Sequence, residues 1–506
     1  MRNKLIFTKW RLNNAMAKRA FLVFSSSTRL LFLVSLCLCV SAVMTFSQTE
    51  TPPAPAAPKT VSIPAVQEKK LANGLTVAVI ERKGNPLVTV QLVVKTGASS
   101  ESADKAGLAN ITADMLTKGT KTRSATQIAE EMAFLGSELN SGAGWNNSTV
   151  SFTATPDKLD QALAIMADAV LNPAFKQEEL DLLKSQTLDE LKYNLKQPSF
   201  VANYVASKYS FGEHPAGGTP DSIGSIARTD VAAFHANYIP SNSVLIFAGD
   251  ISLSQAETLA KKVFGSWKGA SVTPTGTGSS IGRGQKKDIG RILVIDLPNS
   301  GQAAVTYALT VPQIRRGDKR FYDASVMNSV LGGGYSSRLN YEIRIKRGLS
   351  YGAGSSLGWR SSKANFSTRG QTKNESAPQV AELTIAEIKR LSENAVAADE
   401  LTPRKSVLTG NFGRILETTS GLANAVGELY SFGVPPGELD RYMTNVNAVT
   451  DAQIREFASA NLSGGDVIIV GDFSVFKDDL AKRFPGITVD VIKADDLDLS
   501  KPNLRK

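Results

Sequence analysis

The sequence predicts an α+β fold built from two similar domains, each a sandwich of one sheet and its helices. Strand and helix patterns interleave along the chain without the regular strand–helix–strand rhythm of a doubly wound sheet. The second half also repeats the plan of the first. Gly249 and Gly471, each the glycine of a Gly-Asp pair that ends an apolar strand, lie 222 positions apart, and segment 175–180 matches segment 396–401 at a spacing of 221. Nearly equal offsets at two sites indicate an internal duplication.

Length and composition agree with this plan. A chain of 506 residues is too long for one hydrophobic core. Its hydrophobic content of 42% and charged content of 21% are ordinary for a globular protein. We therefore expect two domains with additional segments at the ends.

The N-terminal segment is typical of a secretory signal peptide. Residues 1–29 carry seven basic residues and no acidic one, and an apolar run covers residues 30–43. Small residues stand at the −3 and −1 positions of a cut after Ser47. A membrane anchor is the alternative, but the run is shorter than the roughly 20 residues that span a bilayer. We expect residues 1–47 to be a signal peptide, with no stable membrane anchor after cleavage.

Cleavage after Ser47 would change both the charge and the cysteine content of the chain. It removes seven positive charges and lowers the formal net charge from +10 to +3, so the basic balance gives no argument for nucleic-acid binding. Cys37 and Cys39, the two cysteines of the chain, leave as well. An exported chain without cysteine has no disulfides, and the periplasm of a Gram-negative bacterium fits best.

The elements of the first half follow from its apolar periodicity. Residues 48–66 are rich in Pro and Ala and predict an extended linker, and residues 67–268 form the N-terminal domain. Alternating apolar residues predict strands, helical spacing predicts helices, and Ser124 is the expected N-cap of one of them. The expected strands are 75–80, 88–94, 149–154 and 243–248, and the expected helices are 106–117, 124–135, 158–170 and 177–195.

The second half begins after a polar linker at residues 269–289, which is rich in Gly, Ser and Thr. Residues 290–488 form the C-terminal domain, with a helix, turn and strand at 454–472 that repeat those at 231–250. Residues 489–506 have the composition of a charged, poorly ordered tail.

Segment 107–120 carries the first functional motif. It reads Gly-Leu-Ala-Asn-Ile-Thr-Ala-Asp-Met-Leu-Thr-Lys-Gly-Thr, and helical spacing places Asn110 and Asp114 on one face with Ala113 beside them. The segment resembles the active-site helix of the pitrilysin/insulinase family of zinc peptidases, whose signature is H-x-x-E-H. Asn110, Ala113 and Asp114 stand where that family has its first His, its catalytic Glu and its second His. In the family a further carboxylate follows about 75 residues later, and Glu190 matches it best, with Asp189 as the alternative.

These residue types argue against a catalytic metal in this chain. Zinc prefers imidazole and thiolate, and its catalytic sites use three protein ligands. An oxygen-only set of Asn110, Asp114 and Glu190 would bind calcium or magnesium weakly, because these ions demand six or more oxygen ligands. Ala113 has no proton-transfer chemistry. We expect no metal and no cofactor in this chain, and zinc in a partner subunit.

Segment 331–351 carries the second functional motif, and all the residues that define this motif are present. A Gly-rich turn at Gly332, Gly333 and Gly334 is followed by Ser-Ser-Arg338-Leu and then by Arg344 and Tyr351. This segment resembles the family's C-terminal signature, in which the final Arg and Tyr bind the substrate backbone and stabilise the oxyanion at the zinc helix. The resemblance assigns that role to Arg344 and Tyr351, and substrate binding to Arg338 and the three glycines. The alternative is an exposed helix charge and a tyrosine packed at a strand edge.

The two histidines of the chain give no metal site. His214 stands near Pro215, and His235 lies within a predicted helix, and neither has a second His at ligand spacing. We expect both to be structural.

The resemblance covers nearly all of residues 67–485 and implies half of a peptidase clamshell formed by two such chains. We expect a non-catalytic, substrate-binding subunit of a periplasmic zinc-peptidase heterodimer that degrades short unstructured peptides. Its partner would be a homologous chain with an intact H-x-x-E-H motif. A catalytically inert scaffolding protein of the same fold is one alternative. A self-sufficient metallopeptidase with atypical ligands is another.

Overall fold

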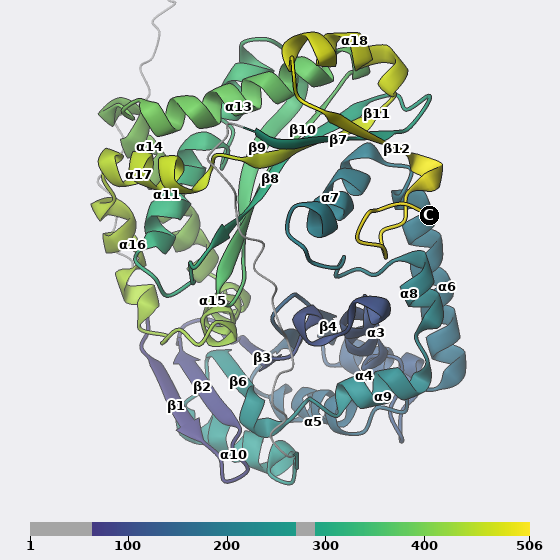
Figure 1. Ribbon diagram of the computed structural model, residues 1–506. Coiled ribbons are helices and arrows are strands. Elements are labelled where there is room, and N and C mark those ends of the chain that lie inside the picture. The colour runs from purple at the N-terminus through teal and green to yellow at the C-terminus, as the bar shows by residue number, and fades with distance from the viewer. Residues whose placement is uncertain (1–62, 270–288) are drawn as a thin grey trace, which may run out of the picture. The chain divides into compact units, whose positions relative to one another are not determined.

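The computed structural model describes residues 63–269 and 289–506 (Figure 1). The predicted signal peptide at 1–47 and nearly all of the two predicted linkers lie outside the described residues. Within the described ranges, none of the helices combines the length and the apolar character needed to cross a membrane.

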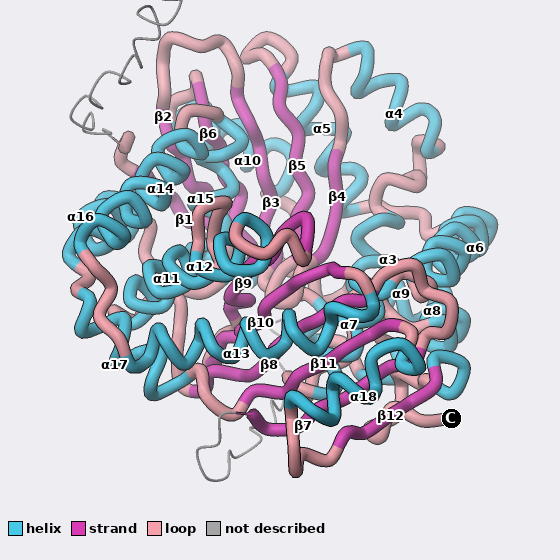
Figure 2. Tube along the Cα trace, turned by 90° about the horizontal axis from the view of Figure 1, so that it is seen from above, coloured by secondary structure: helices cyan, strands magenta, loops and turns pink. Residues whose placement is uncertain are grey.

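Sheet 1 is a six-stranded mixed sheet in the first half. Its strands lie in the order β1-β2-β6-β3-β5-β4, and Figure 2 shows β2, β6, β3, β5 and β4 side by side. β6 pairs parallel with β2 and antiparallel with β3. The four predicted strands of this half are confirmed. The strands are β1 (Val66–Lys70), β2 (Thr76–Glu81), β3 (Val88–Val94), β4 (Asn140–Ala143), β5 (Ser148–Ala154) and β6 (Ser243–Gly249).

Sheet 2 repeats this arrangement in the second half, in the order β12-β7-β11-β8-β10-β9. β7, β11, β8, β10 and β9 take the places of β2, β6, β3, β5 and β4. The predicted duplication and the α+β class with two similar domains are therefore confirmed. The strands are β7 (Ile289–Asp296), β8 (Ala303–Pro312), β9 (Ser350–Trp359), β10 (Lys363–Thr372), β11 (Gly465–Gly471) and β12 (Val489–Lys493).

The prediction of a poorly ordered tail at residues 489–506 is wrong. β12 pairs parallel with β7 and occupies the edge position that β1 has in sheet 1. Beyond it, the side chains of Leu499 and Leu504 are buried against sheet 2. The prediction of disorder rests on the many charged residues of this segment, although the segment also contains the apolar residues that become buried. The C-terminal domain consequently extends past residue 488.

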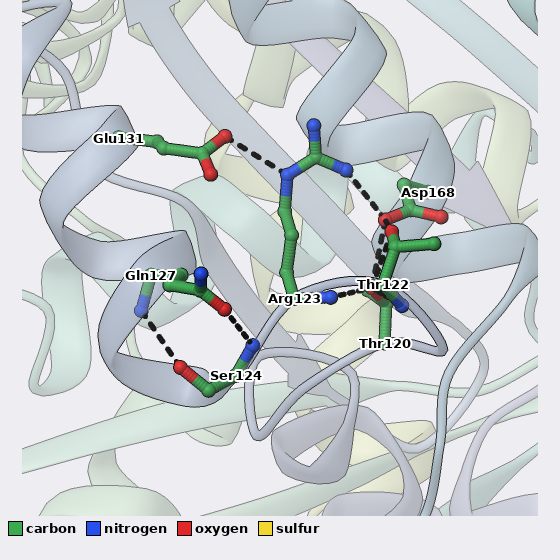
Figure 3. Close-up of polar contacts among 7 residues, drawn as sticks. All are labelled: Thr120, Thr122, Arg123, Ser124, Gln127, Glu131 and Asp168. Atoms are coloured by element: carbon green, nitrogen blue, oxygen red, sulfur yellow. Dashed lines mark hydrogen bonds and ion pairs between the residues drawn. The ribbon is translucent and has the colours of Figure 1, made fainter.

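The helices of the first half follow the predicted order. α4 begins after Ser124, whose hydroxyl accepts a hydrogen bond from the backbone N–H of Gln127 while the Gln127 side chain accepts from the Ser124 N–H (Figure 3). The preceding residue, Arg123, donates to Glu131 and to Asp168 of α5. The helices are α3 (Leu108–Met115), α4 (Ala125–Phe134), α5 (Leu159–Leu171), α6 (Gln177–Asn194), α7 (Pro198–Tyr209), α8 (Pro220–Ser225), α9 (Arg228–His235) and α10 (Leu253–Phe264).

The helices of the second half repeat this set. A π-helical turn, Tyr341–Ile345, follows the short α12 (Arg338–Asn340). The remaining helices are α11 (Arg320–Leu331), α13 (Ala377–Glu393), α14 (Ala398–Leu416), α15 (Thr419–Ser431), α16 (Glu438–Ala448), α17 (Asp451–Asn461) and α18 (Phe473–Arg483). Short 3-10 turns lie at Ala98–Ser100, Ala103–Lys105, Pro240–Asn242, Asn374–Ser376 and Ala494–Asp496.

Each half contributes one helix that packs on the sheet of the other half. Buried residues of α15 pack on one face of sheet 1, against residues such as Val93 and Ile246. Buried residues of α7 pack in the same way on sheet 2, against Leu293 and Ile468. β3, β6 and β11 are consequently buried on both faces. One face of each sheet is therefore shielded from solvent by a helix of the other half.

Candidate functional site

α3, the helix that carries the first predicted motif, is held at its N-terminus by Glu101. This carboxylate is fully buried and accepts hydrogen bonds from the N–H groups of Gly107 (2.8 Å) and Ala109 (2.6 Å). His214 Nε2 lies 3.0 Å from the same carboxylate. Gly107 has a φ of +93°, and a Cβ there would overlap Ile223. Glu101 thus satisfies two backbone N–H groups at the start of the helix.

Two of the degenerate metal positions make contacts inside the fold. The amide nitrogen of Asn110 donates to the carbonyl oxygen of Ala216 at 3.0 Å. Ala113 is fully buried, and its carbonyl oxygen accepts from the Ser141 hydroxyl of β4 at 2.8 Å. Neither residue offers a donor atom suited to zinc at this position.

Asp114 retains an ionisable group on α3. Its carboxyl makes no side-chain hydrogen bond or ion pair with another described residue. Burial raises the pKa of Asp114 to about 6, and the nearby charge of Lys118 opposes that shift. The burial of an unpaired carboxyl without a metal makes its ionisation costly.

Glu190 lies on α6 with its side chain exposed, and it accepts a hydrogen bond from Asn194 at 3.4 Å. Burial and the charge of Glu190 raise the pKa of Tyr204 to about 12. The Tyr204 phenol lies where a Cβ at Gly217 would stand, next to Ala216. Tyr204 therefore packs against the loop whose Ala216 carbonyl accepts from Asn110. Within the described ranges, Glu190 makes no hydrogen bond or ion pair with that loop.

This set of side chains does not fit a catalytic zinc. A zinc site needs three nitrogen, sulfur or carboxylate ligands converging on one point. Here the positions offer an amide engaged with Ala216, a buried methyl group, the Asp114 carboxyl and the exposed Glu190. Across residues 63–269 and 289–506, no three His, Cys, Asp or Glu side chains gather as metal ligands would. That this chain holds no zinc nevertheless stays a prediction.

Both histidines make contacts within the fold. His214 also packs on the Trp145 ring, with 5.0 Å between the centroids. His235 Nε2 lies 2.8 Å from the carbonyl oxygen of Val170, and burial lowers the pKa of its imidazole. These contacts suit structural roles.

Arg344 and Tyr351 meet on an exposed surface of the second half. Arg344 belongs to the π-helical turn 341–345, and Tyr351 lies at the start of β9 with 90% of its surface exposed. The Arg344 guanidinium lies over the Tyr351 ring at 4.7 Å and over the Tyr335 ring at 5.0 Å. It makes no hydrogen bond or ion pair with any residue that the structure describes. Its N–H donors are therefore available to another molecule.

Tyr335 is a functional candidate that the sequence reasoning missed. Its ring is 67% exposed and contributes one side of the cation–π contact to Arg344. Tyr335 directly follows the three glycines of the turn, and this position in the motif could have marked it as a candidate.

The Gly-rich turn supports β9, the edge strand of sheet 2. The Gly332 carbonyl accepts from the Ser355 N–H at 3.0 Å, and the Asn340 side chain accepts from the Ala353 N–H at 3.2 Å. A Cβ at Gly332 would overlap Ser355, and one at Gly333 would stand 2.9 Å from Ser329 Cα, whereas Gly334 faces open space. Of the three glycines, only Gly334 has room beside it for a ligand. Substrate binding by this turn stays a prediction.

Arg338 is held by an ion pair inside the fold. Its side chain is 6% exposed, and its guanidinium donates to both carboxylate oxygens of Glu400, at 2.8 and 2.7 Å. This geometry suits a structural residue that anchors the signature segment to α14. We expected Arg338 to bind substrate, and the Glu400 contact leaves it little capacity to do so.

Comparisons with known proteins decide the family. The model for "Insulinase (Peptidase family M16)" matches residues 76–215, and the model for "Peptidase M16 inactive domain" matches residues 225–408. The chain belongs to the insulinase family. An uncharacterized zinc protease of Rickettsia felis is 26% identical over 75% of this chain and 91% of its own length. The uncharacterized zinc protease YmxG of Bacillus subtilis is 24% identical over 76% and 93%.

Two solved structures share the fold. The crystal structure of a peptidase M16 inactive domain from Pseudomonas fluorescens has a TM-score of 0.71 at 26% identity, covering 80% of this chain and 98% of its own. A protease from Helicobacter pylori has a TM-score of 0.75 at 20% identity, covering 81% and 100%. These matches span both sheets of the chain.

Proposed function

We propose that this protein is a non-catalytic, substrate-binding subunit of a zinc-peptidase heterodimer, and that it supplies Arg344 and Tyr351 to its partner's active site. The observation that carries the proposal is the Arg344 guanidinium, which makes cation–π contacts with two exposed tyrosine rings and has no acidic partner among the described residues. An unpaired arginine held in one orientation at the surface is suited to bind a group from another molecule.

The chemistry suits peptide cleavage. When a peptide bond is attacked, its carbonyl oxygen gains negative charge. The guanidinium of Arg344 and the phenol of Tyr351 can both donate hydrogen bonds to such an oxygen. The flanking rings limit the rotamers of Arg344, so less entropy is lost when it binds.

The partner subunit is needed to supply the zinc site and the general base of the reaction. Asn110, Ala113 and Asp114 provide neither a zinc site nor a general base well matched to the task. No hydrogen bond, ion pair or ring contact within the described ranges joins Arg344 or Tyr351 to α3. A homologous chain with an intact H-x-x-E-H motif would bind the zinc, which supplies an activated water.

The expected substrate is a short, unstructured peptide. An extended peptide can add to a sheet edge through main-chain hydrogen bonds, with little sequence selectivity. β4 is an edge strand packed beside α3, and its residues are partly exposed. The edge of β9 is less open, because Gly332 and Asn340 bind two of its N–H groups. Export to the periplasm is part of the proposal and is supported by the character of residues 1–47.

The test is to purify the chain with an intact-motif homologue and to measure cleavage of an unfolded peptide. We expect Arg344→Ala and Tyr351→Phe each to lower turnover by about 10²–10³-fold, as loss of an oxyanion donor does. Arg441→Ala and Tyr341→Phe are matched controls, because both residues are exposed and no hydrogen bond, ion pair or cation–π contact within the described ranges joins either to Arg344. Unchanged turnover in both test variants would refute the proposal.

The same preparation separates the alternatives. A pair that forms and cleaves peptide with no response to either substitution would indicate a scaffolding role. An isolated chain that contains stoichiometric zinc and cleaves peptide, with loss of activity on chelation, would indicate a self-sufficient peptidase.

A further inference from the structure

Asp114 on α3 is a partly buried carboxylate without a partner. Its side chain makes no hydrogen bond or ion pair with another described residue, and neither of its carboxylate oxygens is fully enclosed by the fold. Both oxygens therefore keep surface that another molecule can reach. Burial is nevertheless strong enough to raise the pKa of Asp114 to about 6.

The fold gives partners to the carboxylates that it buries more deeply. Glu101 accepts from two backbone N–H groups and lies against His214. Removal from water penalises a charge, so a buried carboxylate is normally paired. A lysine or arginine contacts each of Glu213, Glu342, Glu387, Glu438 and Asp466. Asp114 lacks such a group, and a cation from another molecule would supply it.

Lys118 does not fill this place. It contributes a nearby positive charge, but within the described ranges it makes no ion pair with Asp114. α3 ends at Met115, and Lys118 belongs to the turn that follows, where its backbone N–H donates to the Met115 carbonyl oxygen at 3.1 Å. The Asp114 carboxylate therefore remains able to pair with another group.

The position of Asp114 indicates which molecule would carry this cation. α3 packs beside β4, the edge strand of sheet 1 (Figure 1), and the Ser141 hydroxyl of β4 donates to the carbonyl oxygen of Ala113 at 2.8 Å. Ala113 directly precedes Asp114. A peptide that adds to β4 would lie one strand spacing away, about 5 Å. The long, flexible stem of a lysine side chain can span such a gap.

We propose that Asp114 binds a lysine or arginine side chain of a peptide held at β4, so that this chain favours basic peptides. The inference rests on the proposed function, in which the chain binds unstructured peptides. Main-chain hydrogen bonds to an edge strand select little for sequence. A charge-assisted hydrogen bond from an ammonium or guanidinium to Asp114 adds a preference for one class of side chain.

The test uses the purified chain without a peptidase partner. A short peptide of Gly, Ser and Ala with one central lysine is labelled with a fluorophore, and its binding is followed by fluorescence anisotropy at about pH 8. Matched peptides carry glutamine or glutamate in place of the lysine. We expect the lysine peptide to bind about fivefold to tenfold more tightly than the glutamine peptide, and the glutamate peptide to bind most weakly.

A substitution then locates the preference. Asp114→Asn keeps the size of the side chain and removes its charge, and it should bind the lysine and glutamine peptides with nearly equal affinity. This variant should fold, because it removes a partly buried, unpaired charge. Asp189→Asn, on exposed α6, is the matched control and should keep the full preference for lysine.

Three results would overturn the proposal. One is equal affinity of the parental chain for the lysine and glutamine peptides. Another is a preference for lysine that survives in Asp114→Asn. The third is the absence of saturable binding of every peptide at millimolar concentration. Equal affinities would remove only the role of Asp114, whereas unchanged turnover in Arg344→Ala and Tyr351→Phe would refute the proposed function itself.

Discussion

Arg344 differs from the neighbouring arginines in what its side chain contacts. Arg338 is paired with Glu400, and Arg347 with Glu342. Arg344 contacts the two rings of Tyr335 and Tyr351 instead. A paired guanidinium would have to break its ion pair before it could bind a substrate, whereas Arg344 needs no such step. This difference is the main residue-scale evidence for a role in binding.

Asp114 provides a pH-dependent test at the same scale. Its carboxyl has a folded-state pKa of about 6, above the ordinary 3.8. The folded state therefore binds a proton more tightly than the unfolded state, and the free energy of unfolding falls as the pH rises from about 4 to about 6. We expect Asp114→Asn to raise that free energy by about 1–2 kcal/mol at about pH 8, with the shift discounted for partial exposure.

The gain should be much smaller at about pH 4, where the folded-state carboxyl is protonated and the unfolded-state carboxyl is only about half ionised. Urea unfolding at the two pH values measures both differences. Asp189→Asn on exposed α6 is the control and should change little at either pH. An equal gain at both pH values would mean that charge burial is not the cause.

At the scale of elements, α3 forms a helix with Asn110, Ala113 and Asp114 at the three positions compared with the zinc motif. Its stability comes from the buried Glu101 carboxylate at its N-terminus, where the helix dipole also favours negative charge. Glu101 lies before the motif, so a substitution there tests the element and leaves the three degenerate positions intact.

We expect Glu101→Gln to lower the free energy of unfolding by about 2 kcal/mol, because a neutral amide replaces a charged acceptor of several bonds. The comparison is Ser124→Ala, which removes the cap of α4 and should cost about 1 kcal/mol. Urea midpoints give both values. A parental midpoint for Glu101→Gln would show that the N–H groups of Gly107 and Ala109 find other acceptors.

Most strands and helices of the first half could be predicted from periodicity, since their patterns are local. Strand 88–94 and the Ser124 cap were predicted as observed. β12 was missed because its short alternation of apolar and polar residues stands in a charged segment, and its partner β7 lies almost 200 positions earlier. Arg338 was assigned to substrate from the motif that it belongs to, and its ion pair with Glu400, 62 positions later, was not visible in the sequence.

At the scale of the whole molecule, helices α7 and α15 join the two halves. Each covers a sheet face that would otherwise expose apolar side chains. A buried carboxylate adds to this link: Glu213 accepts from Arg360, Lys363 and Asn365 of the other half at 2.7–3.0 Å. Burial alone would raise the pKa of Glu213, but the charges of Arg360 and Lys363 outweigh it and hold that pKa below its usual value.

We expect neither half to fold alone when residues 63–269 and 289–506 are produced as separate chains. Each should show exposed apolar surface by dye binding and poor dispersion in NMR spectra, because one face of its sheet is uncovered. Mixing the two chains during refolding should restore the dispersion. A well-dispersed spectrum from residues 63–269 alone would show that α15 is dispensable for sheet 1.

The sequence by itself determined which residue types α3 carries, and it shows that the helix offers no imidazole. It also determined the duplication, since both copies keep their apolar spacing. Only the tertiary structure decided that Arg344 makes cation–π contacts with two rings, that Arg338 is buried against Glu400, and that the last residues complete a sheet. These outcomes depend on partners far apart along the chain, and such partners leave no local pattern.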